Sequence, residues 1–125
     1  MKPIIKKQWI KALLSGKYKQ GKNYLNKGVK FCCLGVLSDL YAKEHNVKWE
    51  DKEGSNGKLL FNEADVLPSK VMRWAGLFRK NPMIKLTEKV AKKMNYYKNT
   101  KEDLATLNDN GCNFKVIAEC IKQSL

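Results

Sequence analysis

Apolar residues recur every three or four positions in the first part of the chain, which is the spacing of one face of an α-helix. In residues 3–15, Ile5, Trp9 and Leu13 follow this spacing, while the lysines between them fall on the other side. Gly16 comes directly afterwards and suits the left-handed conformation that ends many helices. The pattern therefore predicts an amphipathic helix that buries Trp9.

The segment FCCLGVLSDLYAKEH at residues 31–45 carries the strongest helical pattern of the chain. Its apolar stripe consists of Cys33, Val36, Leu37, Leu40 and Tyr41. Gly35 lies inside this segment, although glycine costs about 1 kcal/mol relative to alanine in a helix interior. We therefore expect Gly35 to allow close packing against another part of the backbone.

Shorter helical patterns follow, each with a residue that suits its start. The expected starts are at or next to Pro68, Thr87, Thr100 and Asn113. In the third of these, Thr100 and Asp103 form a capping-box pattern, which predicts that the helix begins after Thr100. From the stripes of all these helices, the predicted core includes Trp9, Leu37, Trp74 and Ile117.

Turn signals separate short segments that are able to form strands. Residues 47–50 and 58–61 flank a Gly-Ser-Asn-Gly turn and are predicted to pair as a hairpin, and residues 83–86 are predicted to form another short strand. Residues 15–31 should form an irregular loop or a small hairpin. The chain is thus predicted to be a mostly helical α+β domain, single over residues 1–125, with one or two small β-hairpins.

The charge of the chain is strongly positive and unevenly distributed. The sequence holds 25 basic and 12 acidic residues, a net charge of +13, and nine lysines precede the first acid, Asp39. Such a field attracts polyanions. A genome that favours lysine on solvated surfaces explains the same composition. Arg73 and Arg79 are the only arginines, which is few for a protein that grips duplex phosphate.

No apolar run approaches the roughly 18–20 residues that cross a membrane. Lysines interrupt the apolar N-terminal segment, and no small-residue cleavage site follows it. We therefore expect an intracellular protein without a membrane partner.

The four cysteines are Cys32, Cys33, Cys112 and Cys120, and none of them form a Cys-x-x-Cys pair. The single histidine, His45, has no cysteine at ligand spacing. We therefore expect no metal site and reduced thiols that are buried as small hydrophobic residues.

Motifs of common enzyme classes are missing from the sequence. It contains no Gly-x-Ser-x-Gly, no Walker sequence and no Gly-x-Gly-x-x-Gly fingerprint. Asp109 and Glu63 offer a carboxylate pair for acid–base or metal chemistry, but their spacing does not require it, and Asp109 also suits a turn. The expectation is a binding protein that is not an enzyme and needs no cofactor.

The segment SGKYKQGKNYLNKGVKF at residues 15–31 combines groups that recognise nucleotides. Tyr18 offers a ring face for a base, Gln20 offers paired donor and acceptor groups for base edges, and nearby lysines suit phosphates. The candidate binding residues in this loop are Tyr18, Lys19, Gln20, Lys22 and Tyr24. The alternative is a lysine-bearing surface loop whose tyrosines pack on the core.

Three segments of the chain resemble a widespread family of small bacteriophage proteins. They are Tyr-x-Gln followed by FCCLGVLSDL, then LPSKVMRWAGLFRKNP, and finally LATLNDNGCNFKVIAECI. The resemblance covers nearly the whole chain. Two features depart from the family pattern: Ser38 stands where a third cysteine is common, and the segment 83–99 is long and rich in lysine.

The expected architecture is also similar to that of phage anti-CBASS sponges. That resemblance implies a protein that sequesters a cyclic dinucleotide immune signal without turnover. It further implies a homotetramer or homodimer in the cytoplasm of the infected bacterial host. The second and third family segments contribute four more candidate ligand-binding residues, which are Arg79, Asn81, Asn108 and Asp109.

Two other functions remain open at the level of sequence. A DNA- or RNA-binding accessory protein fits the charge of +13 and the lysines interleaved with tyrosines in KVAKKMNYYKNTK. An inhibitor of an acidic host protein fits the same charge.

Overall fold

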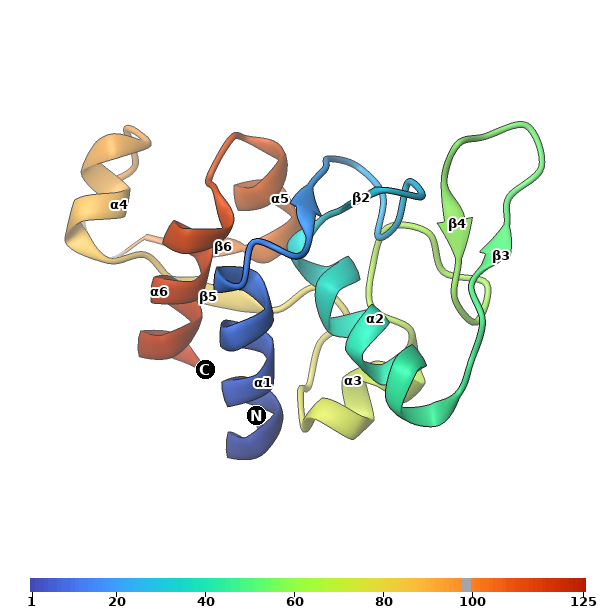
Figure 1. The fold of residues 1–125 in the computed structure, drawn as a ribbon. Helices are drawn as coiled ribbons and strands as arrows, with labels where there is room; N and C mark the ends of the chain where they lie inside the picture. The colour runs from blue at the N-terminus through green and yellow to red at the C-terminus, as the bar shows by residue number, and fades with distance from the viewer. Residues whose placement is uncertain (98–99) are drawn as a thin grey trace.

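The structure is a computed structural model that describes residues 1–97 and 100–125 (Figure 1). Its helices are α1 (Pro3–Leu14), α2 (Cys33–His45), α3 (Ser69–Ala75), α4 (Glu88–Lys93), α5 (Leu104–Asp109) and α6 (Phe114–Ser124). Its strands are β1 (Lys19–Gln20), β2 (Lys30–Phe31), β3 (Glu50–Asp51), β4 (Lys58–Leu59), β5 (Met83–Lys85) and β6 (Lys101–Asp103). The predicted class, a mostly helical α+β single domain with small hairpins, is confirmed.

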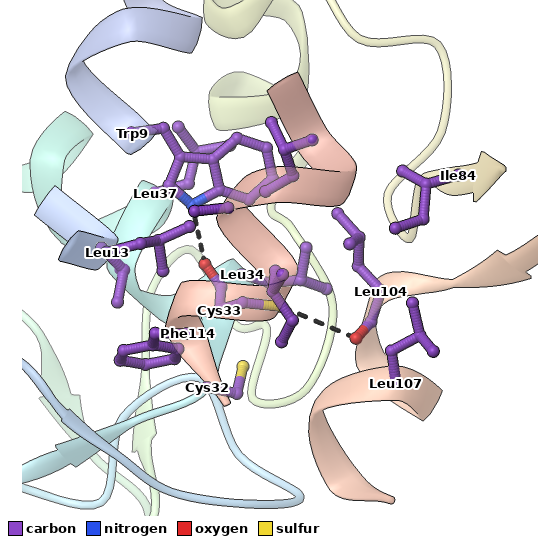
Figure 2. Packing of buried hydrophobic residues seen from close by; sticks show 14 of the residues in the cluster. Trp9, Leu13, Cys32, Cys33, Leu34, Leu37, Ile84, Leu104, Leu107 and Phe114 are labelled. Carbon is purple, nitrogen blue, oxygen red and sulfur yellow. Dashed lines mark hydrogen bonds between the residues drawn. The ribbon is translucent and has the colours of Figure 1, made fainter. Parts of the chain in front are cut away.

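Helices α1 and α6, from opposite ends of the described chain, lie side by side (Figure 1). The Trp9 ring of α1 is fully buried, and its Nε1–H donates a hydrogen bond of 2.9 Å to the Cys33 carbonyl at the start of α2 (Figure 2). Leu37 and Ile117 are also fully buried. The predicted core positions Trp9, Leu37 and Ile117 are confirmed.

Trp74 is half-buried, so the prediction that it belongs to the core is corrected. Helix α3 is short, and Val71 and Ala75, four positions apart, supply its fully buried face. The Trp74 ring lies on the flank of this face, edge to face with Tyr41 at 5.3 Å between centroids. It covers the side of the core and keeps part of its surface exposed.

Helix α2 runs between α1 and the β3–β4 hairpin (Figure 1), and most of its first two turns are buried. Gly35 in this helix contacts the backbone of Leu25, as its position in the sequence predicts. A side chain at Gly35 would overlap the Leu25 carbonyl oxygen. The loop before α2 therefore packs directly on the helix backbone.

The strands are short and form two-stranded pairs. The predicted hairpin is present as β3 and β4, which pair antiparallel, but its first strand is Glu50–Asp51 and not residues 47–50 as predicted. Strand β5 pairs antiparallel with β6. In residues 15–31 the chain forms an irregular loop, in which β1 and β2 pair in parallel and the residues between them turn back against Phe31. The parallel register joins Lys19 to Lys30 and Gln20 to Phe31.

Helix α5 begins three residues later than the capping-box pattern predicts. Its N-cap is Asp103, whose Oδ1 accepts a hydrogen bond of 2.8 Å from the Thr106 backbone N–H, so the predicted cap at Thr100 is wrong. Both residue types suit an N-cap. The pairing of β6 with β5 keeps residues 101–103 extended, and the helix begins only after the pair ends. The predicted N-caps Thr87 and Asn113 are confirmed.

Candidate functional site

An open pocket of about 480 Å³ lies between α1, the loop that follows it, and α2. The Tyr18 ring forms one wall. Lysine side chains reach the pocket from all three segments, as Lys11, Lys17 and Lys43. The remaining lining residues are Gln8, Ala12, Ser15, Leu40 and Glu44. We call this cavity the Tyr18 pocket.

The buried Asp39 carboxylate fixes the position of Tyr18. The Tyr18 hydroxyl donates a hydrogen bond of 2.6 Å to Asp39 Oδ2, and Trp49 Nε1–H donates one of 3.0 Å to Asp39 Oδ1. The Lys43 ammonium lies 3.2 Å from Asp39 Oδ2. The Tyr18 ring also packs edge to face on Phe31, with centroids 5.1 Å apart. The ring is therefore held rigidly at the pocket wall.

Two of these groups have shifted pKa values. Burial, followed by the hydrogen bond to Asp39, raises the pKa of the Tyr18 phenol above its ordinary value of 10.0. The hydrogen bond with Tyr18 raises the pKa of Lys43, and Asp39 adds to this shift. Near neutral pH the pocket thus presents a neutral phenol and a charged ammonium group.

The other two lysines of the pocket are available to a ligand. Lys11 and Lys17 are exposed, and neither has an ion-pair partner within residues 1–97 and 100–125. The Lys43 ammonium is paired with Asp39 but lies on the surface, 5.2 Å from the Tyr18 ring centroid. Glu44 is the one acid that lines this pocket. The pocket thus combines an aromatic ring with three lysines, which suits an anion with a planar group.

Gln20 and Asn108 interlock inside the protein. Gln20 Nε2 donates to Asn108 Oδ1 at 2.9 Å and to the Cys112 carbonyl at 2.7 Å, while Gln20 Oε1 accepts from the Phe114 N–H at 3.0 Å. The fully buried Asn108 also accepts from the Cys33 N–H and donates to the Gly21 carbonyl. These amide groups therefore join β1, α2, α5 and α6, and the structure gives them a structural role.

The three remaining candidates of the first loop lie apart from the Tyr18 pocket lining. Lys19 and Lys22 are exposed. Tyr24 is half-buried against Gly57, and the Lys27 ammonium lies 5.3 Å from its ring centroid. Tyr18 is thus the member of the predicted loop set that lines this pocket.

Asn81 and Asp109 line a second pocket of about 380 Å³, together with Asn23, Cys32, Asp65, Val66 and Ala105. Asn81 donates to Asp103 Oδ1 at 2.8 Å and accepts from the Ala105 N–H at 3.1 Å. Asp109 Oδ1 accepts from the Asn23 N–H at 3.0 Å. Arg79 lies elsewhere, exposed beside Phe78. The structure therefore distributes the nine predicted site residues over several places.

The sequence-based set lacks four residues that build the Tyr18 pocket or fix its ring: Lys11, Lys17, Lys43 and Asp39. The spacing of Asp39 and Lys43, four apart on a helix, was a usable signal for a local ion pair. No sequence pattern near Tyr18 indicated that its hydroxyl donates a hydrogen bond to Asp39 from outside the helix.

The thiols and the histidine show no arrangement for metal binding. All four cysteines are free and buried, and burial raises the pKa of Cys32 to about 11. Within the part of the chain that the structure describes, no three His, Cys, Asp or Glu side chains group to hold a metal ion. In the same residues, no helix has the length and apolar character needed to cross a membrane.

Comparison with known proteins identifies the family. A family model described as "Domain of unknown function (DUF8296)" matches residues 1–125. The chain belongs to this family. No curated protein and no solved structure matches the chain.

Proposed function

We propose that the protein binds a small anionic nucleotide in the Tyr18 pocket and sequesters it without turnover. The observation that supports this most directly is the fixed Tyr18 ring surrounded by Lys11, Lys17 and Lys43. A base stacks on the exposed part of the ring, and the ammonium groups of the lysines bind phosphate oxygens. The volume of about 480 Å³ lies in the range of small-molecule pockets.

The protonation states of the pocket favour binding over chemistry. General acid–base catalysis works best when the pKa of the catalytic group lies near the working pH. The pKa values of Tyr18 and Lys43 are instead raised. These two groups therefore keep their protons near neutral pH. The Tyr18 hydroxyl donates its proton to Asp39, so the Lys43 ammonium group is the one of the two that has an N–H left for a ligand.

The identity of the ligand and the biological setting rest on the sequence resemblance to phage proteins. By that resemblance, the ligand is a cyclic dinucleotide made by host CBASS defence, and the protein acts in the cytoplasm of the infected bacterium. The same resemblance supports a homotetramer or homodimer. A two-fold assembly would present two Tyr18 pockets to a ligand with two phosphates.

A matched pair of variants tests the stacking role. Tyr18→Phe keeps the ring and removes the hydroxyl, whereas Tyr18→Leu removes the ring. In a thermal-shift screen of cyclic dinucleotides, mononucleotides and oligonucleotides, we expect a cyclic dinucleotide to stabilise the wild type and Tyr18→Phe. Tyr18→Leu should lose affinity by about 1–3 kcal/mol, the range for base–aromatic stacking. Tyr97→Leu, at a tyrosine that is 91% exposed, is the control.

Recovery of the ligand tests the absence of turnover. After incubation and heat denaturation, the cyclic dinucleotide should return intact in the amount added. Cleaved nucleotide would show an enzyme. Equal affinity of Tyr18→Leu and the wild type for the cyclic dinucleotide would show that the ligand does not bind in the Tyr18 pocket.

The charge of +13 favours a second candidate, a binder of DNA or RNA. A polymer that covers several phosphates gives a steep salt dependence, with a slope of about −0.9 per phosphate on duplex DNA. A dinucleotide gives a shallow slope. Tight binding of oligonucleotides with a steep slope, and none of cyclic dinucleotides, would favour the second candidate.

A further inference from the structure

An apolar groove of about 560 Å³ runs along the surface where α1 lies beside α6. Ile4, Ile10 and Leu14 of α1 and Ala118 of α6 line it. Ile4 is 72% exposed and Leu14 is 56% exposed, although both are large aliphatic side chains. Helix α1 already buries its other apolar face in the core. It therefore carries a second apolar stripe that the rest of the described chain leaves open.

Lysines surround this groove. Lys6 and Lys7 on α1 and Lys115 and Lys122 on α6 line it, together with one acid, Glu119. Lys6 Nζ donates to the Lys122 carbonyl at 3.0 Å and so binds the C-terminal end of α6. Among the residues that the structure covers, none of these lysines has an ion-pair partner. The groove is thus apolar along its length and positive at its edges.

We infer that this groove binds an amphipathic helix of a partner protein whose polar face is acidic. In such complexes, apolar residues spaced by three and four positions enter the groove. Glutamate or aspartate beside that stripe would meet the lysines. Ile4 and Leu14 are separated by roughly 15 Å along α1, at about 1.5 Å per residue, so a partner helix of about three turns spans the groove.

Charge decides between this partner and a second copy of the chain. A two-fold contact through the groove would bring the lysine edges of two copies together. Like charges oppose such a contact, whereas an acidic helix neutralises the lysines as it docks. The groove therefore fits an acidic partner better than it fits itself.

A designed peptide tests the inference without knowledge of the natural partner. The probe is a fluorescein-labelled peptide of about 15 residues, with leucine at helical spacing of three and four and glutamate elsewhere. Its matched control has lysine in place of every glutamate. Fluorescence anisotropy should show binding of the glutamate peptide to the wild type, weaker at high salt, and no binding of the lysine peptide.

Three protein variants locate the binding surface. Leu14→Gln should weaken the glutamate peptide about tenfold, which corresponds to the loss of one buried leucine side chain. Lys7→Gln combined with Lys115→Gln should also weaken it and reduce its salt dependence. Val29→Gln, at an apolar residue that is 74% exposed in another part of the chain, should bind as the wild type does. Thermal melts establish that every variant folds.

Several results would overturn the inference. Equal affinity of Leu14→Gln and the wild type would place the peptide elsewhere, and equal binding of the two peptides would remove the role of charge. A dimer in light scattering that Leu14→Gln dissociates would show that a second copy occupies the groove. Ile4 and Leu14 do not line the Tyr18 pocket, so these outcomes are independent of nucleotide binding.

Discussion

The backbone of Leu25 lies against Gly35 so closely that no side chain fits between them. A Cβ atom built on Gly35 lies 2.9 Å from Leu25 Cα and overlaps the carbonyl oxygen of the same residue. Leu25 itself is fully buried, and its N–H donates to the Ala64 carbonyl at 2.7 Å. Leu25 thus connects α2 to the loop that contains Ala64, and its backbone is held on both sides.

Gly35→Ala should destabilise the protein, although alanine is the better helix former by about 1 kcal/mol. The overlap is with backbone, so the loop or the helix must shift, and we expect a loss of about 3 kcal/mol or more in the free energy of unfolding. Urea denaturation measures it. Gly111→Ala is the comparison, since space is open there and only its positive φ of 97° opposes the change. A neutral effect of Gly35→Ala would contradict the packing.

Asn108→Asp should unfold the protein more readily than Asn108→Ala. In the wild type, Asn108 Nδ2 donates to the Gly21 carbonyl at 2.8 Å and to Asp109 Oδ1 at 3.2 Å. Aspartate replaces this donor with a buried charge that faces two oxygen acceptors. We expect losses of about 3–5 kcal/mol for Asp, from an unpaired buried charge, and less for Ala. Asn56→Asp, at an exposed turn residue, is the control for thermal melts.

Trp9 and Trp74 should respond differently to replacement by phenylalanine. Trp9→Phe removes volume from a fully buried site and the donor to the Cys33 carbonyl, so a loss of about 2–4 kcal/mol is expected. Trp74→Phe removes atoms from a half-buried ring and should cost less than half as much. Chemical denaturation of both variants gives the comparison. Similar losses would mean that Trp74 belongs to the core after all.

The contribution of Tyr18 to stability should depend on pH. Because its pKa is raised in the folded state, the folded chain holds the phenol proton more tightly than the unfolded chain does. This stabilisation is present below about pH 10 and is lost as the pH rises through the raised pKa. Tyr18→Phe should therefore lose about 1–2 kcal/mol at pH 7, and the difference from the wild type should shrink above pH 10. A difference that stays constant between pH 7 and pH 11 would argue against the Asp39 contact.

The thiols should be unreactive in the native state. All four cysteines are buried, and burial raises the pKa of each, so little thiolate forms at pH 8. Titration with a thiol reagent, without reductant, should give four thiols in denaturant and a slow reaction in the folded protein. Two thiols in denaturant would reveal a disulfide. One fast thiol in the folded protein would reveal a reactive cysteine.

Local sequence patterns were sufficient for most helices of this chain. The stripe of α1, its stop near Gly16 and the caps Thr87 and Asn113 depend on residues within one or two turns of each other. The late start of α5 could not be predicted from local patterns. Asp103 and Thr100 are both good caps, and the choice between them is made by strand pairing with residues 83–85.

The candidate site was harder to predict from the sequence, because it is formed by segments that are far apart in the chain. Gln20 has paired donor and acceptor groups, which suit a nucleotide base and a buried backbone equally well. The structure satisfies the donor with Asn108 and Cys112 and the acceptor with Phe114, which lie 88, 92 and 94 positions away. Tyr18, in the loop, is likewise fixed by Asp39, which is 21 positions away on α2. Spacing within the loop contains no information about either partner.

The pairing of α1 with α6 has a consequence for how the chain folds. During synthesis, at roughly 5–20 residues per second, α1 is made before α6. Helix α6, which packs beside α1, becomes available only after all the elements between them have been made. Until then Ile5, Trp9 and Leu13, which α1 buries in the folded chain, lack some of the elements that cover them. In the folded chain, by contrast, Met1 and Leu125 line the same pocket, so probes attached at these two residues would report on the same corner of the surface (Figure 1).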